Sequence, residues 1–262
     1  MAFIQCGFHS DVLGRACAMN VILPQKVKTQ IGMASSGSGR KDYPVVYLLH
    51  GLSDDHTIWS RRSSIERYAA EYEVAVVMPN GERGFYTDMI EGYRYWTMLS
   101  EELPEIVCNL FPVSPRREDT FAAGLSMGGY GALKLALRRP DRYAGAVGLS
   151  SVTDIRARME SADWKTMGRE LNNIFGSASD LIPRGNDLFE LAAKAVNAPE
   201  TPRILTVCGT EDFLYQDNLR FRDHMRELNF PNYEYLEAPG AHQWSFWDLH
   251  IQYGLKFLLE NR

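Results

Sequence analysis

Cysteine is scarce in this sequence. The 262 residues include four cysteines, and none forms a C-x-x-C pair or lies near a histidine cluster, so we predict no metal site. Reduced, buried thiols are our interpretation of all four. A disulfide between two of them, Cys6 and Cys17, is the alternative if the N-terminal segment forms a hairpin. The other two are Cys108 and Cys208.

A basic excess and long apolar runs are also missing. Lys and Arg total 28 against 33 Asp and Glu, which gives a formal net charge of −5. Nucleic-acid-binding proteins usually carry a basic face, so we expect no nucleic-acid partner. No apolar run approaches the roughly 18 residues of a membrane span, and the first residues lack the pattern of a signal peptide. We therefore expect no membrane span and a cytoplasmic location.

What the sequence does contain predicts an α/β fold. Hydrophobic residues make up 45% of the chain, enough for a sizeable core. Residues 3–23 hold two β-leaning runs broken at 10–14, which predicts an antiparallel hairpin at a sheet edge. From residue 43, short apolar runs alternate with helical stretches, which predicts a mostly parallel sheet. The predicted strands are 45–49, 74–78, 120–124, 145–149, 204–208 and 233–237, and the predicted helices are 58–71, 98–109, 127–139, 217–228 and 244–259.

The chain shows no sign of a domain boundary. We expect one domain over residues 1–262. The β-α alternation lapses between residues 154 and 198, which we interpret as a small helical insertion above the sheet, where such folds build lids and pockets. Residues 34–40, rich in Ser and Gly, predict a flexible surface loop between two strands.

The segment Gly124-Leu-Ser126-Met-Gly128 has the G-x-S-x-G pattern of a nucleophile elbow. It lies between a predicted buried strand and a predicted helix, which is the context that an elbow needs. A glycine on each side of Ser126 removes side chains that would clash in the sharp turn. The N-terminus of the following helix directs free N–H groups at the serine oxygen. We therefore predict that Ser126 is a nucleophile.

A serine hydroxyl is a weak nucleophile at neutral pH and needs a base that is oriented by an acid. In elbows of this kind the chain order is serine, acid, histidine. His224 and His250 fall within predicted helices. His242 lies in a Pro-Gly loop after a strand, at the sheet edge where catalytic groups gather. We predict His242 as the general base.

Asp212 is the candidate for the acid. It lies just beyond a predicted strand, and the adjacent Glu211 would then point elsewhere. Asp154, after the preceding strand, is the alternative position, and Asp217 lies further along, in the following helix. A carboxylate at Asp212 would fix the imidazole tautomer and stabilise the imidazolium.

Two backbone N–H groups are candidates for an oxyanion hole. One belongs to Met127, the residue after the serine, and the other to Leu52, in the loop after an early strand. Gly51 lets the backbone of this loop approach a substrate. The side chain of His50 we interpret as structural, holding the loop in place.

Aromatic residues are candidates for a substrate pocket. We select Trp59 and Trp244, the latter because it lies two residues from His242. Core packing is the alternative for any one of these aromatic residues. The same alternatives apply to Tyr86, Trp96 and Trp247.

Two adjacent carboxylates, Asp54 and Asp55, lie beside a turn. Residues in such positions are usually solvated or cap the next helix. Neither metal-ligand spacing nor a phosphate-binding glycine loop is present after the first predicted strand. We therefore expect no metal and no cofactor.

With these segments assembled, the chain resembles the esterase D-like branch of the α/β hydrolases, which includes tributyrin esterases, S-formylglutathione hydrolases and feruloyl or acetyl-xylan esterases. The resemblance extends from about residue 3 to the C-terminus, and the chain looks most similar to small bacterial tributyrin esterases. Its most specific parts are LLHGL at 48–52, GLSMGGYGAL at 124–133, GTEDFLY at 209–215 and GAHQW at 240–244.

The resemblance implies an α/β-hydrolase fold, a Ser-His-Asp triad and the same two oxyanion donors, in agreement with the residues chosen above. It also implies a serine carboxylesterase that acts on small-molecule, short-chain acyl esters. Leu125 is a departure, because S-formylglutathione hydrolases usually have histidine before the serine. A thioesterase of that kind and an acyltransferase on the same scaffold stay open as alternatives, as does a homo-oligomer.

Overall fold

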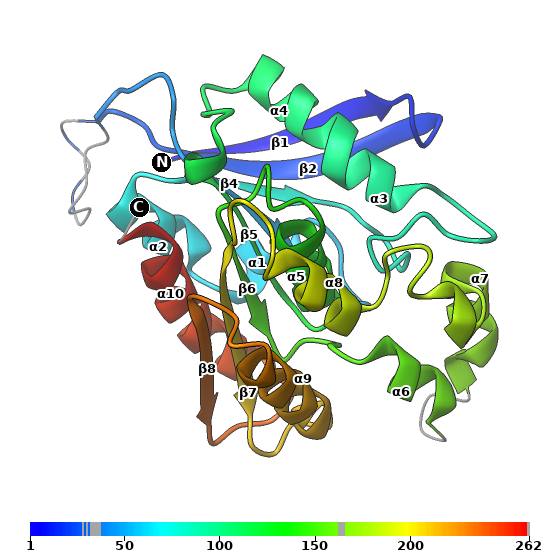
Figure 1. Ribbon diagram of the computed structural model, residues 1–262. Helices are drawn as coiled ribbons and strands as arrows, with labels where there is room; N and C mark the ends of the chain where they lie inside the picture. Colours follow the sequence, from blue (N-terminus) through cyan, green and yellow to red (C-terminus); the bar gives the residue numbers. More distant parts are fainter. Residues whose placement is uncertain (28, 30, 32–37, 162–165, 261–262) are drawn as a thin grey trace.

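The computed structural model describes residues 1–27, 29, 31, 38–161 and 166–260. At its centre lies an eight-stranded sheet with the order β1-β2-β4-β3-β5-β6-β7-β8 (Figure 1). β2 pairs antiparallel with β1 and β4, and every other pairing is parallel. The α/β-hydrolase fold with an N-terminal hairpin is thus confirmed. The strands are β1 Ala2–Ser10, β2 Arg15–Leu23, β3 Val45–Leu49, β4 Ala75–Pro79, β5 Thr120–Leu125, β6 Gly145–Leu149, β7 Arg203–Gly209 and β8 Tyr233–Ala238.

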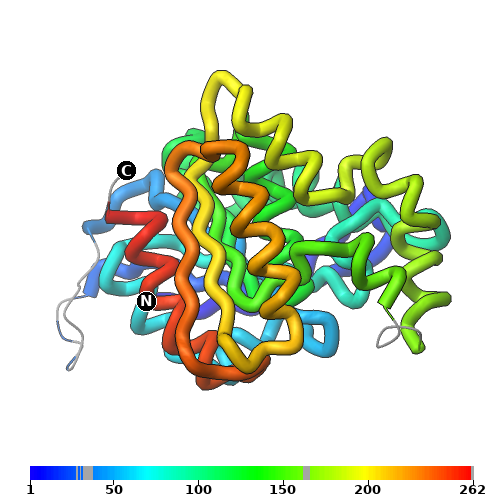
Figure 2. Tube along the Cα trace, turned by 60° about the horizontal axis from the view of Figure 1, so that its bottom comes forward, coloured from blue at the N-terminus to red at the C-terminus, as the bar shows by residue number. Residues whose placement is uncertain are grey.

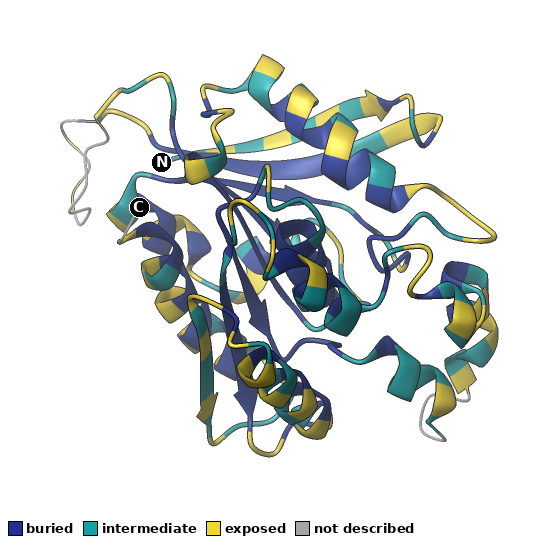
Figure 3. Ribbon diagram, viewed as in Figure 1, coloured by how far each residue is buried: buried dark blue, intermediate teal, exposed yellow. Residues whose placement is uncertain are grey.

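Helices cover both faces of the sheet. In β3, Val45, Tyr47 and Leu49 pack into one core cluster, and Val46 and Leu48 pack into the other. β3, β4, β5 and β6 are therefore buried along their whole length (Figure 3). One face carries α1 (Ile58–Arg62), α2 (Ile65–Tyr72) and α10 (Trp244–Leu259), and the other carries α3 (Tyr95–Thr97), α4 (Leu103–Leu110), α5 (Met127–Arg138), α8 (Leu188–Ala195) and α9 (Tyr215–Glu227).

The stretch between β6 and β7 has two parts. α6 (Ile155–Glu160) and α7 (Gly168–Phe175) lie to one side of the sheet (Figures 1 and 2), and we call these two helices the cap. α8 instead packs against α5 and α9. It is therefore the crossover helix from β6 to β7, and only the first part of the predicted insertion at 154–198 extends beyond the helical layer.

The predicted helix at 98–109 extends from α3 through a π-helical turn, Met98–Glu102, into α4. Pro104 explains the wider turn, because it has no N–H and its ring clashes with the carbonyl four residues earlier. That carbonyl, of Ser100, accepts a hydrogen bond at 2.6 Å from Nη1 of Arg142. A distant side chain thus replaces the missing helical donor.

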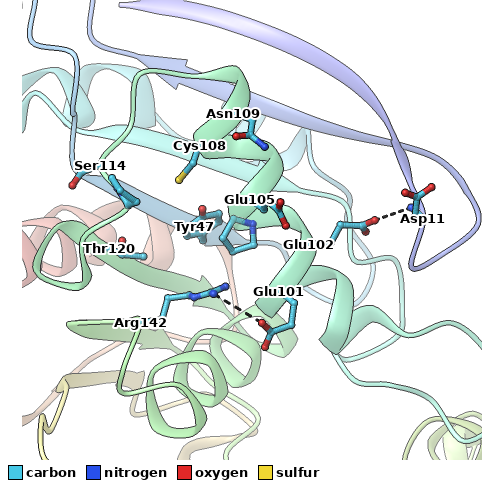
Figure 4. Close-up of a pocket in the computed structure, with 12 residues that line it drawn as sticks. Asp11, Tyr47, Glu101, Glu102, Glu105, Cys108, Asn109, Ser114, Thr120 and Arg142 are labelled. Atoms are coloured by element: carbon cyan, nitrogen blue, oxygen red, sulfur yellow. Dashed lines mark hydrogen bonds and ion pairs between the residues drawn. The ribbon is translucent and has the colours of Figure 1, made fainter.

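The same π-helical turn holds the N-terminal hairpin. Glu102 accepts a hydrogen bond from the N–H of Asp11 at 2.7 Å (Figure 4). It also accepts from the N–H of Val12 at 3.2 Å and from the Ser10 hydroxyl. These contacts lie at one side of a cavity of about 670 Å³, and none of the predicted site residues lines it. A carboxylate with three donors fixes the hairpin turn against the helical layer.

The predicted helix at 58–71 is divided into α1 and α2. Ser63 is extended, with φ −138° and ψ 171°. Its hydroxyl donates to the carbonyl of Trp59 at 2.5 Å, in competition with a continuing helix. The two serines at 63 and 64 were the available signal for this break.

All four cysteines are free thiols. Cys208 is buried and the other three are half-buried, so the expectation of burial is met by Cys208 alone. The hairpin register pairs Cys6 with Met19 and Cys17 with Phe8, and no disulfide joins the two. The predicted loop at 34–40 falls, for residues 34–37, outside the described residues. Within the described ranges, no helix has the length and hydropathy of a membrane span.

Candidate active site

Ser126 lies at the sharp turn between β5 and α5. Its backbone has φ 54° and ψ −119°, a strained conformation for a residue with a side chain. A Cβ atom on Gly124 would lie 2.3 Å from the carbonyl oxygen of Gly128, and one on Gly128 would lie 2.3 Å from that of Leu49. Only glycine permits this close approach of strand and helix, which keeps the strained turn in place.

Three side chains that the sequence selects come together at the carboxyl edge of the sheet. Nε2 of His242 lies 3.0 Å from Oγ of Ser126. Nδ1 of His242 lies 2.9 and 3.0 Å from the two carboxylate oxygens of Asp212. Asp212 follows β7 and His242 follows β8, and the N–H of Leu214 donates to Oδ1 of Asp212 at 2.9 Å. This hydrogen bond holds the carboxylate of Asp212 in place beside the imidazole.

Two aromatic rings hold the imidazole of His242. The ring of Phe213 lies 4.5 Å away between centroids, and the ring of Trp247 lies 4.8 Å away, edge to face. Trp247 is itself fixed, because its Nε1–H donates to the hydroxyl of Ser150 at 3.0 Å. These contacts limit rotation of the imidazole away from Ser126.

Glu211 points away from the imidazole, as the choice of Asp212 requires. Its carboxylate accepts hydrogen bonds from the N–H of Gly240 and from the hydroxyl of Thr210 at 2.8 Å. The N–H of Glu211 donates in turn to the carbonyl of Gly240 at 3.0 Å. Glu211 thus holds the loop that carries His242, a contact that the sequence did not reveal.

The alternative carboxylates are engaged elsewhere. Asp154 accepts from the N–H of Ala157 at 2.9 Å as the N-cap of α6 and pairs with Arg220 at 3.0 Å. Asp217 is buried between Arg158 and Arg220, each at 2.7 Å. Neither carboxylate contacts an imidazole within the described residues.

The alternative histidines contact backbone carbonyls. Nε2 of His224 lies 3.0 Å from the oxygen of Phe189, and Nδ1 of His250 lies 2.8 Å from that of Phe246. Each ring therefore donates to its own helical surroundings. Of the three histidines after Ser126, His242 is the one beside it.

Two N–H groups flank Ser126. Met127 is the first residue of α5, so its N–H has no acceptor one turn earlier in the helix. Leu52 follows β3 in the facing loop, next to Gly51, and both line the same cavity as Ser126. The positions suit donors to an oxygen that develops negative charge.

The side chain of His50 holds the loop that carries Leu52. Its Nε2 accepts from the N–H of Gly81 at 2.9 Å, and its Nδ1 lies 2.8 Å from the carbonyl of Gly51. Burial lowers the pKa of His50, so a neutral ring with the proton on Nδ1 makes both bonds. The hydroxyl of Tyr86 donates to the carbonyl of His50 at 2.9 Å. His50 has the structural position expected of it.

A buried lysine lies behind this loop. Nζ of Lys134 donates to the carbonyl of Tyr86 at 3.3 Å, to the hydroxyl of Thr87 at 2.9 Å and to the side-chain oxygen of Asn186 at 2.7 Å. Burial lowers the pKa of Lys134 well below its ordinary value, with Arg138 adding to the effect. Lys134 joins the Tyr86 segment to the chain that follows the cap.

Ser126 and His242 line a cavity of about 620 Å³. Trp244 lines it, as predicted for the pocket. Trp59 does not: it is 1% exposed, its Nε1–H donates to the carbonyl of Leu49 at 3.0 Å, and its ring packs against Trp244. Trp59 is thus a core residue that packs behind the cavity-lining Trp244. Other apolar lining residues are Phe85, Val152, Met167, Phe213 and Trp247.

The adjacent carboxylates of Asp54 and Asp55 lie in different surroundings. Asp55 is exposed, as expected, and accepts hydrogen bonds from the N–H and the hydroxyl of Thr57 at 2.8 and 2.6 Å, just before α1. Asp54 instead lines the cavity beside Ser126. The expectation of a solvated or capping side chain is therefore wrong for Asp54. Across the described residues, no His, Cys, Asp and Glu side chains gather into a cluster that could hold a metal ion.

A serine on a strained strand-to-helix turn, facing a histidine and a carboxylate at the carboxyl edge of a parallel sheet, defines the α/β-hydrolase class. The family model described as "Putative esterase" matches residues 10–258, and the chain belongs to this esterase family.

The chain is similar to several characterised proteins. An acetyl esterase of Caldicellulosiruptor saccharolyticus is 31% identical over 257 residues, 96% of each chain. The structure of FphF, a fluorophosphonate-binding serine hydrolase of Staphylococcus aureus, has a TM-score of 0.85 at 37% identity. The structure of FrmB, an S-formylglutathione hydrolase of the same organism, has a TM-score of 0.82 at 37% identity. Both comparisons cover 98% of each chain. The protein is a carboxylic ester hydrolase of the serine type.

Proposed function

We propose that Ser126 is the nucleophile, His242 the general base and Asp212 the acid that orients it. The observation that carries this proposal is the line of contacts from Oγ of Ser126 through the imidazole to the carboxylate, at 3.0 and 2.9 Å. His242 removes the proton of Ser126 as Oγ attacks the ester carbonyl, and then gives it to the departing alcohol.

The N–H groups of Leu52 and Met127 are the oxyanion donors in this proposal. They would bind the carbonyl oxygen as it becomes negative in the tetrahedral intermediate, and one such donor typically contributes about a hundredfold or more in rate. The collapsed intermediate is an acyl-enzyme on Ser126. A water that is activated by His242 then releases the acid and restores the serine.

Short-chain acyl esters of small alcohols are the proposed substrates. The cavity of about 620 Å³ has room for a small ester, and Trp244 and Trp247 bound it on the side of His242. The acetyl esterase relative also supports a short acyl group. We propose no cofactor for this reaction.

The test is hydrolysis of 4-nitrophenyl acetate, butyrate and octanoate by the wild type and by Ser126→Ala. We expect faster turnover of the acetate or butyrate than of the octanoate, and a loss of at least about a thousandfold in kcat/KM in the variant. A folded wild type that is inactive on all three esters, or a variant that keeps its activity, would contradict the proposal.

Thioester hydrolysis is the second candidate, favoured by the similarity to FrmB. Leu125, where those hydrolases usually have histidine, favours the ester instead. Comparison of kcat/KM for S-formylglutathione and 4-nitrophenyl acetate separates the two. Acyl transfer, the third candidate, would appear as partition of the acyl-enzyme to an added alcohol in place of water.

We propose further that residues 1–262 act as one domain, in the cytoplasm and without a nucleic-acid partner. The support for one domain is that the inward side of α7 packs into the same core cluster as α5 and α9. The support for the cytoplasm is the half-buried free thiols of Cys6 and Cys17, which stay reduced there.

A further inference from the structure

One carboxylate in the cavity has no part in the proposed reaction. The position that a Cβ on Gly51 would occupy lies 3.2 Å from Oδ2 of Asp54 and 3.8 Å from Cβ of Ser126. The carboxylate oxygen and Ser126 therefore both border the small space that a side chain at Gly51 would fill. Asp54 lies on the wall of the cavity, on the same side as the Leu52 loop.

The charge of Asp54 is not balanced inside the cavity. Of the described lining residues, Asp54 is the only carboxylate, and neither lysine nor arginine is among them. His242, the other titratable lining residue, is already paired with Asp212. The cavity therefore carries a net negative charge close to the scissile bond.

The charged groups around Asp54 do not cancel its negative charge. Asp55, next in the chain, adds negative charge. Arg61 and Arg62 oppose it from the last turn of α1, but both are exposed, where water weakens their effect. Arg83, whose side chain reaches the carbonyl of Leu52, pairs with Glu170 at 2.6 Å and brings no net charge.

The Asp54 carboxylate is partly buried and so is partly shielded from water. This burial raises its pKa, with the negative charge of Asp55 adding to the rise, while Arg62 and Arg61 lower it. A carboxylate in such a position interacts with a nearby ligand charge more strongly than one in bulk water does.

We propose that Asp54 selects substrates by charge: it disfavours esters and thioesters whose acyl or leaving group is anionic, and favours neutral or cationic ones. This inference rests on the proposed esterase function of the same site. On this proposal, glutathione thioesters are disfavoured, because glutathione brings carboxylates to the site. Asp54 forms and breaks no bond, so its effect is on binding and on the approach of the substrate.

The experiment compares matched charges on the leaving group. The substrates are 4-acetoxybenzoate (anionic), its methyl ester (neutral) and 4-acetoxy-N,N,N-trimethylanilinium (cationic), at pH 8. The acyl side is tested with 4-nitrophenyl hexanoate and 4-nitrophenyl hydrogen adipate, which have acyl chains of six carbons. The proteins are the wild type, Asp54→Asn, Asp54→Glu and, as the control, Asp55→Asn.

The readout is the ratio of kcat/KM for the charged substrate to that for its neutral partner. We expect Asp54→Asn to raise the anionic-to-neutral ratio about five- to tenfold in at least one series, and to lower the cationic-to-neutral ratio by a similar factor. Asp54→Glu, which keeps the charge, should retain the wild-type ratios, and Asp55→Asn should change them less than twofold.

Three outcomes overturn the inference. If Asp54→Asn leaves all ratios within twofold of the wild type while the neutral esters are hydrolysed, Asp54 has no role in charge selection and the proposed function stands. If the folded wild type hydrolyses none of the neutral esters, the proposed function fails and the inference fails with it. Equal changes in Asp54→Asn and Asp55→Asn would also contradict a specific role.

Discussion

The carboxyl edge of the sheet and the cap are built in different ways. At the edge, each of the three aligned side chains follows a strand, and hydrogen bonds and ring contacts surround them. The cap meets the rest of the chain through both of its helices. Arg158 of α6 pairs with Asp217, and Glu170 of α7 pairs with Arg83. The N–H groups of Ile90 and Glu91 also bond to the last turn of α7. The three aligned side chains thus each adjoin a strand of the sheet, whereas the cap lies to one side of it.

This difference has a consequence for specificity. The inner side of α7, with Leu171, Ile174 and Phe175, is buried, whereas much of the rest of the cap is exposed or half-buried (Figure 3). Met167, the residue before α7, lines the cavity, so the cap borders the site while Ser126 and His242 are held by other elements. We therefore expect changes at the edge to affect the rate strongly and changes at the cap to affect it weakly.

The largest expected effect is at the edge. Asp212→Asn should lower kcat for 4-nitrophenyl acetate by about 10³- to 10⁴-fold, because the amide cannot hold the imidazole with its proton on Nδ1. The melting temperature of the variant serves as the control for folding. A fall of less than tenfold in a folded protein would mean that Asp212 does not orient His242.

The next largest effect is expected on the stability of the protein, and it concerns the buried Lys134. The pKa of Lys134 is well below 10.5 in the folded protein because of burial, whereas the unfolded chain holds the proton up to about 10.5. Between these two pKa values the unfolded state binds more protons, so the free energy of unfolding rises with pH through this window. Lys134→Met should lack that rise.

Urea unfolding of the wild type and Lys134→Met at pH 7, 8, 9 and 10 measures this effect. The difference in free energy of unfolding, wild type minus variant, should increase with pH. Other titrating groups, such as the buried tyrosines, are shared by both proteins and cancel in the difference. A difference that stays constant from pH 7 to 10 would show that Lys134 titrates in its ordinary range.

A smaller effect is expected at the loop that supports Leu52. Tyr86→Phe removes the hydrogen bond to the carbonyl of His50 and should lower kcat about three- to tenfold with little change in KM, because the donor matters most when the oxyanion forms. Tyr130→Phe is the matched control, since its hydroxyl is equally buried and donates to the carbonyl of Asn186. Equal losses of kcat in both variants would point to a general packing effect.

The smallest effect is expected at the cap. Arg83→Gln and Glu170→Gln each break an ion pair between partly exposed side chains, and such pairs contribute about 0.2–1 kcal/mol. We expect changes below about threefold in kcat/KM for 4-nitrophenyl acetate. A tenfold loss in both variants would remove the contrast between edge and cap, because the cap would then control the Leu52 loop through Arg83.

The sequence predicted the edge well, because its signals are local. The predicted strand at 74–78 differs from β4 by one residue at each end, and those at 45–49 and 145–149 coincide with β3 and β6. The elbow pattern and the order serine, acid, histidine were enough to select three residues that the fold brings within hydrogen-bond distance. Their catalytic roles stay a proposal.

Features that depend on distant partners could not be predicted. At the π-helical turn Met98–Glu102, Pro104 is a local signal, but the donor that satisfies the Ser100 carbonyl is Arg142, from another part of the chain. Whether a tryptophan lines the cavity depends on loop conformation: Trp59 turns into the core and Trp244 to the cavity. The different directions of Asp54 and Asp55 have the same origin.

The distance along the chain between two members of the proposed triad also has a consequence for biosynthesis. Ser126 and His242 are 116 residues apart. At a synthesis rate of about 5–20 residues per second, the serine leaves the ribosome between about 6 and 23 s before the histidine. During that time the nascent chain carries the elbow without His242. On the proposed mechanism, hydrolysis begins only when β8 and α10 have completed the sheet edge, so its appearance would report the end of folding.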